Sequence, residues 1–112
     1  MYKIVAVLAN PQNELELYRA ANALSKAAGS KGIDLKIEIQ EYPLTHRHLT
    51  EAEISLCDVA ILTGDTPLTG VERFSGIPVW RTLTNRIFAD PAAVLSAAIK
   101  HVDVQSRSLT AV

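Results

Sequence analysis

An unbroken run of apolar residues from Ile4 to Ala9 constrains the fold of this chain more than any other feature of the sequence. The run is rich in β-branched side chains, which predicts a strand buried on both faces, as in the centre of a parallel sheet. Turn-forming residues follow at 10–13, and from Glu14 apolar residues recur at steps of three and four. A buried strand, a turn and an amphipathic helix in succession are typical of an α/β domain.

The rest of the chain repeats this alternation of strands with helices. We predict a half-exposed strand at 35–40, a polar loop at 41–49 and a short helix that starts with a capping box at 50–53. A buried strand at 59–62 and a fourth strand at 78–82 follow. The expected fold class is α/β: a small four-stranded parallel open sheet of order 2-1-3-4, with helices on both faces in three α/β/α layers.

The last helix is expected to begin at Asp90 and Pro91, which are a good N-cap and first helical residue. The sequence becomes polar from Asp103, which predicts a frayed end. We therefore expect one domain over residues 1–102, followed by a polar C-terminal tail over 103–112. A length of 112 residues suits a single domain.

Composition narrows the range of partners. Eleven basic and twelve acidic residues give a net charge of -1, so electrostatics provides no reason to expect nucleic acid or an anionic membrane as a partner. No apolar run approaches the about 20 residues of a membrane span, which predicts no direct membrane insertion. The single cysteine, Cys57, excludes an intrachain disulfide and suits the reducing cytoplasm. We expect no cofactor. We also expect no metal, because His46 and His48 alternate on a loop without a nearby cysteine, which is a weak metal-binding pattern.

The site of an open α/β sheet forms outside the carboxyl ends of its strands. Four loops are predicted to meet there, at 10–13, 40–49, 63–67 and 82–84. The first loop joins a buried strand to the N-terminus of a long helix, where free N–H groups and the helix dipole favour anions. Asn10 and Asn13 in this loop are either turn and capping residues or part of a site for a neutral ligand or a partner.

Several stretches carry a resemblance. Residues 3–13 read K-I-V-A-V-L-A-N-P-Q-N against K-I-V-A-V-T-A-C-P-T-G, residues 38–41 read E-I-Q-E against E-T-Q-G, and residues 49–54 read L-T-E-A-E-I against L-T-x-E/D-D/E-I. Residues 57–62 read C-D-V-A-I-L against A-D-V-V-I-L, and an E-R-F-x-G element stands at 72–76. Together these stretches resemble the fructose-type enzyme IIB domains of the bacterial phosphotransferase system (PTS), and the likeness reaches to about Ala98.

In that family, the cysteine of the first stretch accepts phosphate from a histidine of enzyme IIA and passes it to the sugar held by membrane-bound enzyme IIC. The attacking group is a thiolate, but Asn10 stands at the cysteine position, and a carboxamide forms no comparable phospho-intermediate. Asn13 replaces a glycine, which removes freedom at positive φ, and Glu16 replaces a histidine. A carboxylate here opposes a phosphate dianion by about 1 kcal/mol or more per close pair. The changes favour a chain that is not a phosphotransferase enzyme.

The resemblance therefore implies a non-phosphorylatable IIB-like subunit of a sugar uptake system, with a regulatory or architectural role. It would be cytoplasmic, peripheral to a membrane transporter, and would dock on enzyme IIA, enzyme IIC or an intact paralogous IIB. The expected partner surface comprises Asn10, Pro11, Gln12, Asn13, Gln40, Tyr42, Pro43 and Asp65.

Two other functions stay open. One is an active phosphocarrier with a non-standard acceptor, for which His46 and His48 are the candidates, and the other is a small-molecule sensor that reuses the emptied pocket. Cys57 is not a candidate acceptor, because it lies at the amino end of its strand. Asp65 and Arg81 are expected to pair with each other, and Trp80 is expected in the core or as a partner anchor.

Overall fold

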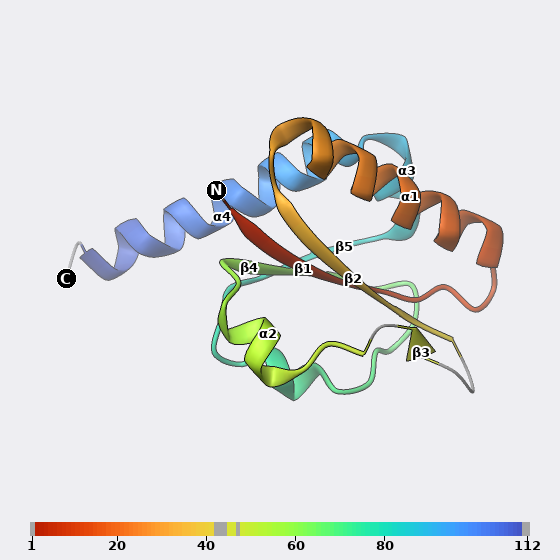
Figure 1. The fold of residues 1–112 in the computed structure, drawn as a ribbon, viewed down its shortest axis with the longest axis horizontal. Helices are drawn as coiled ribbons and strands as arrows, with labels where there is room; N and C mark the ends of the chain where they lie inside the picture. Colours follow the sequence, from red (N-terminus) through yellow and green to blue (C-terminus); the bar gives the residue numbers. More distant parts are fainter. Residues whose placement is uncertain (1, 42–44, 47, 111–112) are drawn as a thin grey trace.

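A computed structural model describes residues 2–41, 45–46 and 48–110 of the chain, the last seven of these by their backbone only. Strands and helices alternate along it (Figure 1). In chain order they are β1 (Lys3–Leu8), α1 (Glu14–Lys31), β2 (Asp34–Gln40), β3 (Thr45–His46), α2 (Glu51–Ser55), β4 (Val59–Thr63), the 3-10 helix η1 (Val71–Phe74), β5 (Val79–Thr82), α3 (Thr84–Ala89) and α4 (Pro91–Thr110).

One sheet runs through the molecule in the order β3-β2-β1-β4-β5. Its β2, β1, β4 and β5 are all parallel, which confirms the predicted parallel sheet and its order. The two-residue strand β3 pairs antiparallel with the end of β2, with Ile39 opposite His46, inside the segment predicted as a loop. A pairing this short leaves no periodic signal in the sequence, because it depends on the neighbouring edge and not on a run of its own.

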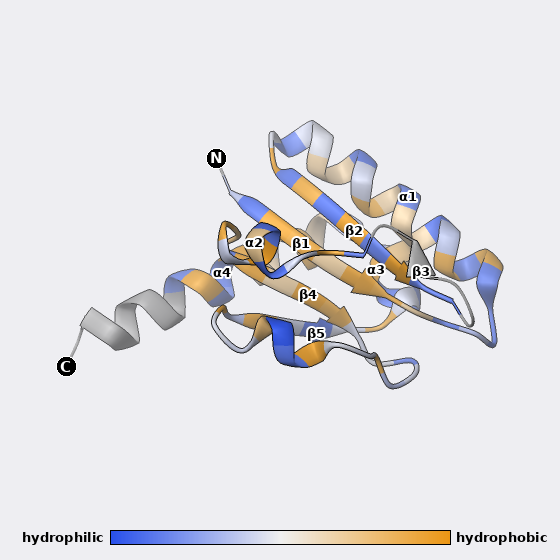
Figure 2. Cartoon of the chain, turned by 60° about the horizontal axis from the view of Figure 1, so that its bottom comes forward, coloured by the Kyte–Doolittle hydropathy of each residue, from blue (hydrophilic) through white to orange (hydrophobic). Residues whose placement is uncertain are grey.

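The two faces of the sheet are buried by different helices. Helices α1, α3 and α4 lie on one side, and α2 with η1 lies on the other (Figure 1). Within β1, Ile4 and Leu8 point into the first core and Val5 and Val7 into the second, so the whole strand is apolar. Figure 2 shows the same result as hydrophobic colouring along β1 and β4. The continuous apolar run is thus explained by burial on both faces.

Local signals set most helix ends. Asn13 caps α1, Gly32 ends it in the left-handed conformation with φ of 69°, and Thr50 forms the predicted capping box with Glu53 at the start of α2. Asp90 accepts a hydrogen bond from the Ala93 N–H at 3.1 Å, as expected for the cap of α4. Helix α4 continues to Thr110, so most of the segment predicted as a frayed tail is helical. No helix in the described part of the chain is long and apolar enough to cross a membrane.

Candidate functional site

Asn10 follows β1 at the carboxyl edge of the sheet, and its side chain makes one hydrogen bond to the described residues. Its carboxamide nitrogen donates a hydrogen bond to the hydroxyl of Thr84 at 2.9 Å. Thr84 is fully buried, and it is the first residue of α3. The backbone N–H of the preceding Ala9 donates to the Thr63 hydroxyl at 3.1 Å, which ties the same loop to the end of β4. Residue 10, which the sequence resemblance aligns with a cysteine, is therefore a half-buried, hydrogen-bonded amide.

Thr84 also joins Asn10 to Asp65. The Thr84 backbone N–H donates to the Asp65 carboxylate at 2.9 Å, so Asp65 caps α3 from a different loop. The expected pair between Asp65 and Arg81 is wrong, because no ion pair joins these two described residues and the carboxylate bonds the helix instead. Helix α3 was not predicted, since its own N-cap, Leu83, has no capping side chain. The cap comes from tertiary structure, which the local sequence does not reveal.

The first loop is a tight turn that closes onto α1. The Asn13 N–H donates to the Asn10 carbonyl at 3.1 Å, and the Glu16 N–H donates to Asn13 Oδ1 at 3.1 Å. Asn13 Nδ2 in turn donates to the Glu16 carboxylate at 3.0 Å. Asn13 has φ of -149°, which is extended backbone, and it serves as the N-cap of α1 without entering the positive-φ region. Pro11 and Gln12 are exposed at the tip of the turn.

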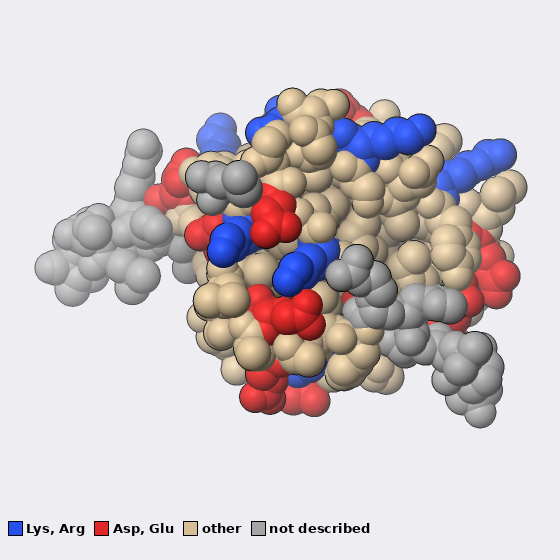
Figure 3. Space-filling model, in the orientation of Figure 1, with Lys and Arg blue, Asp and Glu red and all other residues tan. Residues whose placement is uncertain are grey.

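These contacts change what the loop offers to an anion. Two N–H groups at the start of α1, those of Asn13 and Glu16, are already bonded within the chain. Glu14 and Glu16 both stand in the first turn of the helix. Figure 3 shows acidic side chains gathered at the end of the molecule where α1 begins. The N–H groups of Asn13 and Glu16 are thus not free to bind an anion, and the nearby carboxylates are negatively charged. Both effects oppose phosphate binding.

The second loop is anchored by a carboxylate that lies inside the protein. Glu38 has no solvent exposure, although the alternation of β2 predicted an outward-facing side chain. Its oxygens accept hydrogen bonds from the Leu49 N–H at 2.7 Å and from Gln40 Nε2 at 2.8 Å. Arg73 Nη1 and Nη2 each donate to one Glu38 oxygen at 2.9 Å. Every part of this carboxylate is therefore satisfied within the described residues.

Arg73 extends the same network to two other segments. Its Nη1 donates to the Leu49 carbonyl at 2.6 Å and its Nε to the Gly70 carbonyl at 2.7 Å. Gly70 has φ of 70°, and a Cβ there would lie 2.8 Å from Arg73 Nε, so both backbone and space require glycine. Burial raises the pKa of Glu38, but hydrogen bonds from Arg73, Gln40 and the Leu49 N–H outweigh this, and the net effect lowers the pKa.

Gln40, which the sequence analysis assigned to the partner surface, is hydrogen-bonded within this network. Besides its bond to Glu38, Nε2 donates to the Thr69 carbonyl at 2.9 Å, and Oε1 accepts from the Thr69 N–H at 2.9 Å. The amide therefore joins the end of β2 to the loop that follows β4.

Sequence reasoning missed Glu38, Arg73 and Thr84 as site-forming residues. The signals were a glutamate in a strand and an arginine in an E-R-F-x-G element, and neither indicates burial.

The other predicted residues are distributed as follows. Tyr42 and Pro43 lie outside the described residues, and for His46 only the backbone is described. His48 is exposed and its Nδ1 lies 3.5 Å from Glu38 Oε1. Cys57 is half-buried before β4, its Sγ donates to the Glu53 carbonyl at 3.3 Å, and burial raises the pKa of its thiol. Trp80 is half-buried and packs against the first core.

Comparison with known proteins gives a consistent result. No model of a protein family matches the chain. The chain is 33% identical over 102 residues to the PTS system fructose-like EIIB component 2 of Escherichia coli K12, covering 91% of this chain and 96% of that protein. It is 34% identical over 110 residues to the PTS system fructose-specific EIIB'BC component of Rhodobacter capsulatus, covering 98% of this chain but only 19% of that larger protein.

A solved structure agrees in fold. The crystal structure of a predicted fructose-specific IIB from Escherichia coli has a TM-score of 0.83 and 30% identity to this chain, over 91% of this chain and 90% of that one. The resemblance noted in the sequence is thereby confirmed over nearly the whole length of a relative of similar size. The chain belongs to the fructose-type enzyme IIB family of the phosphotransferase system.

Proposed function

We propose that this protein is a non-phosphorylatable IIB-type subunit of a fructose-type PTS, which acts in the cytoplasm by docking and not by carrying phosphate. Its role is regulatory or architectural. The observation that carries the proposal is the Asn10 carboxamide at the cysteine position, hydrogen-bonded to Thr84 at 2.9 Å. An amide nitrogen that donates to a hydroxyl is not a nucleophile, and no proton transfer at neutral pH converts it into one.

The surroundings of Asn10 support the same conclusion. The Asn13 and Glu16 N–H groups are bonded within the turn, and the Glu16 carboxylate accepts from Asn13. Substitution of Asn10 by cysteine alone would therefore leave a loop that is closed and negatively charged. Several independent changes oppose phosphate, whereas a carrier that had lost only its acceptor would keep an open, neutral loop.

The fold supports docking because it is intact. The carboxyl edge is held by the Asn10–Thr84–Asp65 chain on one side and by the Glu38–Arg73 network on the other. We propose that this edge presents the family's docking surface, with exposed Pro11, Gln12 and Asn13 at its centre. The partner would be enzyme IIA, enzyme IIC or an intact IIB. The name of the Rhodobacter relative, EIIB'BC, places a second B-type part beside B and C parts, which fits a companion role.

One experiment separates phosphate transfer from docking. The protein is incubated with labelled phosphoenolpyruvate, enzyme I, HPr and the cognate enzyme IIA, and both label and complex formation are measured. We expect no stable label on this chain, together with saturable binding of enzyme IIA, IIC-containing vesicles or intact IIB that Asn13→Lys weakens. Arg19→Glu, an exposed charge change on α1, is the control variant for binding.

The outcome also tests the two competing functions. Acid-labile label would place phosphate on a histidine, and His48 beside Glu38 would then be the first site to map. A shift in melting temperature with a small molecule, but no binding to any PTS protein, would favour the sensor. Either result would overturn the docking proposal.

A further inference from the structure

The outer edge of β5 is open to solvent. In the described part of the chain, β5 pairs only with β4. The Pro78 carbonyl accepts from the Ala60 N–H and the Thr82 carbonyl accepts from the Gly64 N–H, both at 2.9 Å. Backbone groups alternate sides along a parallel strand. The N–H and C=O groups of Trp80 therefore also face β4, whereas those of Val79 and Arg81 face outward. These outward groups can pair with another extended chain.

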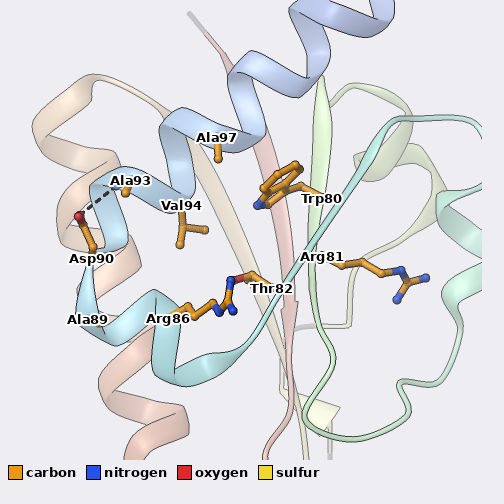
Figure 4. Close-up of a pocket in the computed structure, with 9 residues that line it drawn as sticks. All are labelled: Trp80, Arg81, Thr82, Arg86, Ala89, Asp90, Ala93, Val94 and Ala97. Atoms are coloured by element: carbon orange, nitrogen blue, oxygen red, sulfur yellow. Dashed lines mark hydrogen bonds between the residues drawn. The ribbon is translucent and has the colours of Figure 1, made fainter.

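A hollow lies directly beside this edge. It has a volume of about 430 Å³ and is bounded by β5, α3 and the first turns of α4. Trp80 and Thr82 point toward it, and Val94 and Ala97 form the wall on α4 (Figure 4). Arg81 points to the opposite face of the sheet (Figure 4). An added strand would therefore place alternate side chains in the hollow and the others beside Arg81.

The charge beside the edge is positive on both faces. Neither Arg81 nor Arg86 has an ion-pair partner among the described residues. Arg86 lines the hollow, and Asp90, the acidic residue that also lines it, uses its carboxylate to cap the Ala93 N–H. The hollow thus offers the apolar side chains of Trp80, Val94 and Ala97 together with Arg86, and Arg81 adds a cationic side chain on the opposite face of the sheet. The complementary segment carries apolar residues on the face toward the hollow and carboxylates on the face toward Arg81.

We propose that the β5 edge binds an extended acidic segment of a partner protein, which adds as a further strand with alternating apolar and acidic side chains. This surface is separate from the loop of Asn10, so the inference goes beyond the docking function proposed above. A second copy of the chain fits less well. An antiparallel contact between two β5 strands would bring both Arg81 side chains to the same face of the joined sheet, where like charges repel.

The test uses the full-length 15N-labelled protein and a short capped peptide in which glutamates alternate with valine and leucine. A second peptide has lysine in place of every glutamate. We expect the acidic peptide to shift the amide resonances of Val79 and Arg81 and to slow their hydrogen exchange, since the added strand occupies these N–H groups. The lysine peptide should leave both unchanged. Arg81→Glu should weaken the acidic peptide about tenfold or more.

A matched control variant and four contrary outcomes test whether the acidic peptide binds at the β5 edge. Arg19→Glu makes the same charge change on an exposed position of α1 and should leave peptide affinity unchanged. Equal binding of the lysine peptide, unchanged affinity of Arg81→Glu, or shifts confined to residues 10–13 would each overturn the proposal. So would concentration-dependent shifts at Val79 and Arg81 without peptide, because these would assign the edge to self-association. Since none of these readouts involves phosphate or a PTS protein, failure here is distinguishable from failure of the docking function.

Discussion

Arg73 and Glu38 form a bidentate ion pair inside the protein, in which Nη1 lies 2.9 Å from Oε1 and Nη2 lies 2.9 Å from Oε2. The Glu38 side chain has no exposure to solvent and that of Arg73 only 7%. The pair connects β2 to η1, and its further bonds reach Leu49 and Gly70. It therefore holds the two loops that flank the site, and its cost of burial is offset only while every bond is present.

Removal of one partner should be strongly destabilising. Arg73→Met leaves the Glu38 carboxylate buried without its counter-charge, and we expect a loss of about 3–5 kcal/mol in the free energy of unfolding. Lys36→Met is the control, because Lys36 pairs with Glu53 at 3.3 Å with both side chains over 30% exposed, at 39% and 33%. That exposed pair should contribute less than about 1 kcal/mol. If urea unfolding gave equal losses in the free energy of unfolding for the two variants, the buried pair would contribute no more to stability than the exposed one.

The same pair predicts an acid dependence of stability. The folded state lowers the pKa of Glu38, so its carboxylate stabilises the fold above the unfolded pKa of about 4.3 and loses this effect as pH falls through the lower folded value. We expect the free energy of unfolding to fall below about pH 4. Glu38→Gln should be less stable at pH 7 and should show a shallower slope between about pH 5 and 3. Parallel slopes for the two proteins would contradict this assignment.

The fold was largely predictable because its signals are local and repeated. The apolar run at 4–9, the capping box at 50–53 and the Asp90–Pro91 pair each state an element within a few residues. The polar contacts of the site were not predictable for the opposite reason. Glu38 and Arg73 are 35 positions apart in the chain, and Asn10 and Thr84 are 74 apart. A polar residue shows its type in the sequence but not its partner, so burial was missed.

Asp65 is expected to control both α3 and the Asn10 side chain. Asp65→Ala removes the hydrogen bond to the Thr84 N–H and should cost about 1 kcal/mol, as loss of an N-cap does. Because Thr84 also accepts from Asn10, the side-chain amide resonances of Asn10 should shift. Asp90→Ala removes the cap of α4 at a similar cost and serves as the control. In the Asp90→Ala variant the side-chain amide resonances of Asn10 should be unchanged. Equal shifts of these resonances in both variants would refute the connection through Thr84.

Asn10→Cys tests whether the site lacks only its nucleophile. The new thiol would stand before α1, where the helix N-terminus lowers a thiol pKa, whereas burial raises the pKa of Cys57. We expect residue 10 to react faster than Cys57 with a thiol reagent, with the Cys57→Ala background used to assign the signal. Phosphate transfer from enzyme IIA should nevertheless stay poor, because Glu14 and Glu16 repel the dianion and Asn13 closes the turn. Addition of Asn13→Gly and Glu16→His should raise the transfer rate measurably. If Asn10→Cys alone accepts phosphate as fast as an intact family member, the loop is competent, and the protein differs from a phosphocarrier only at residue 10.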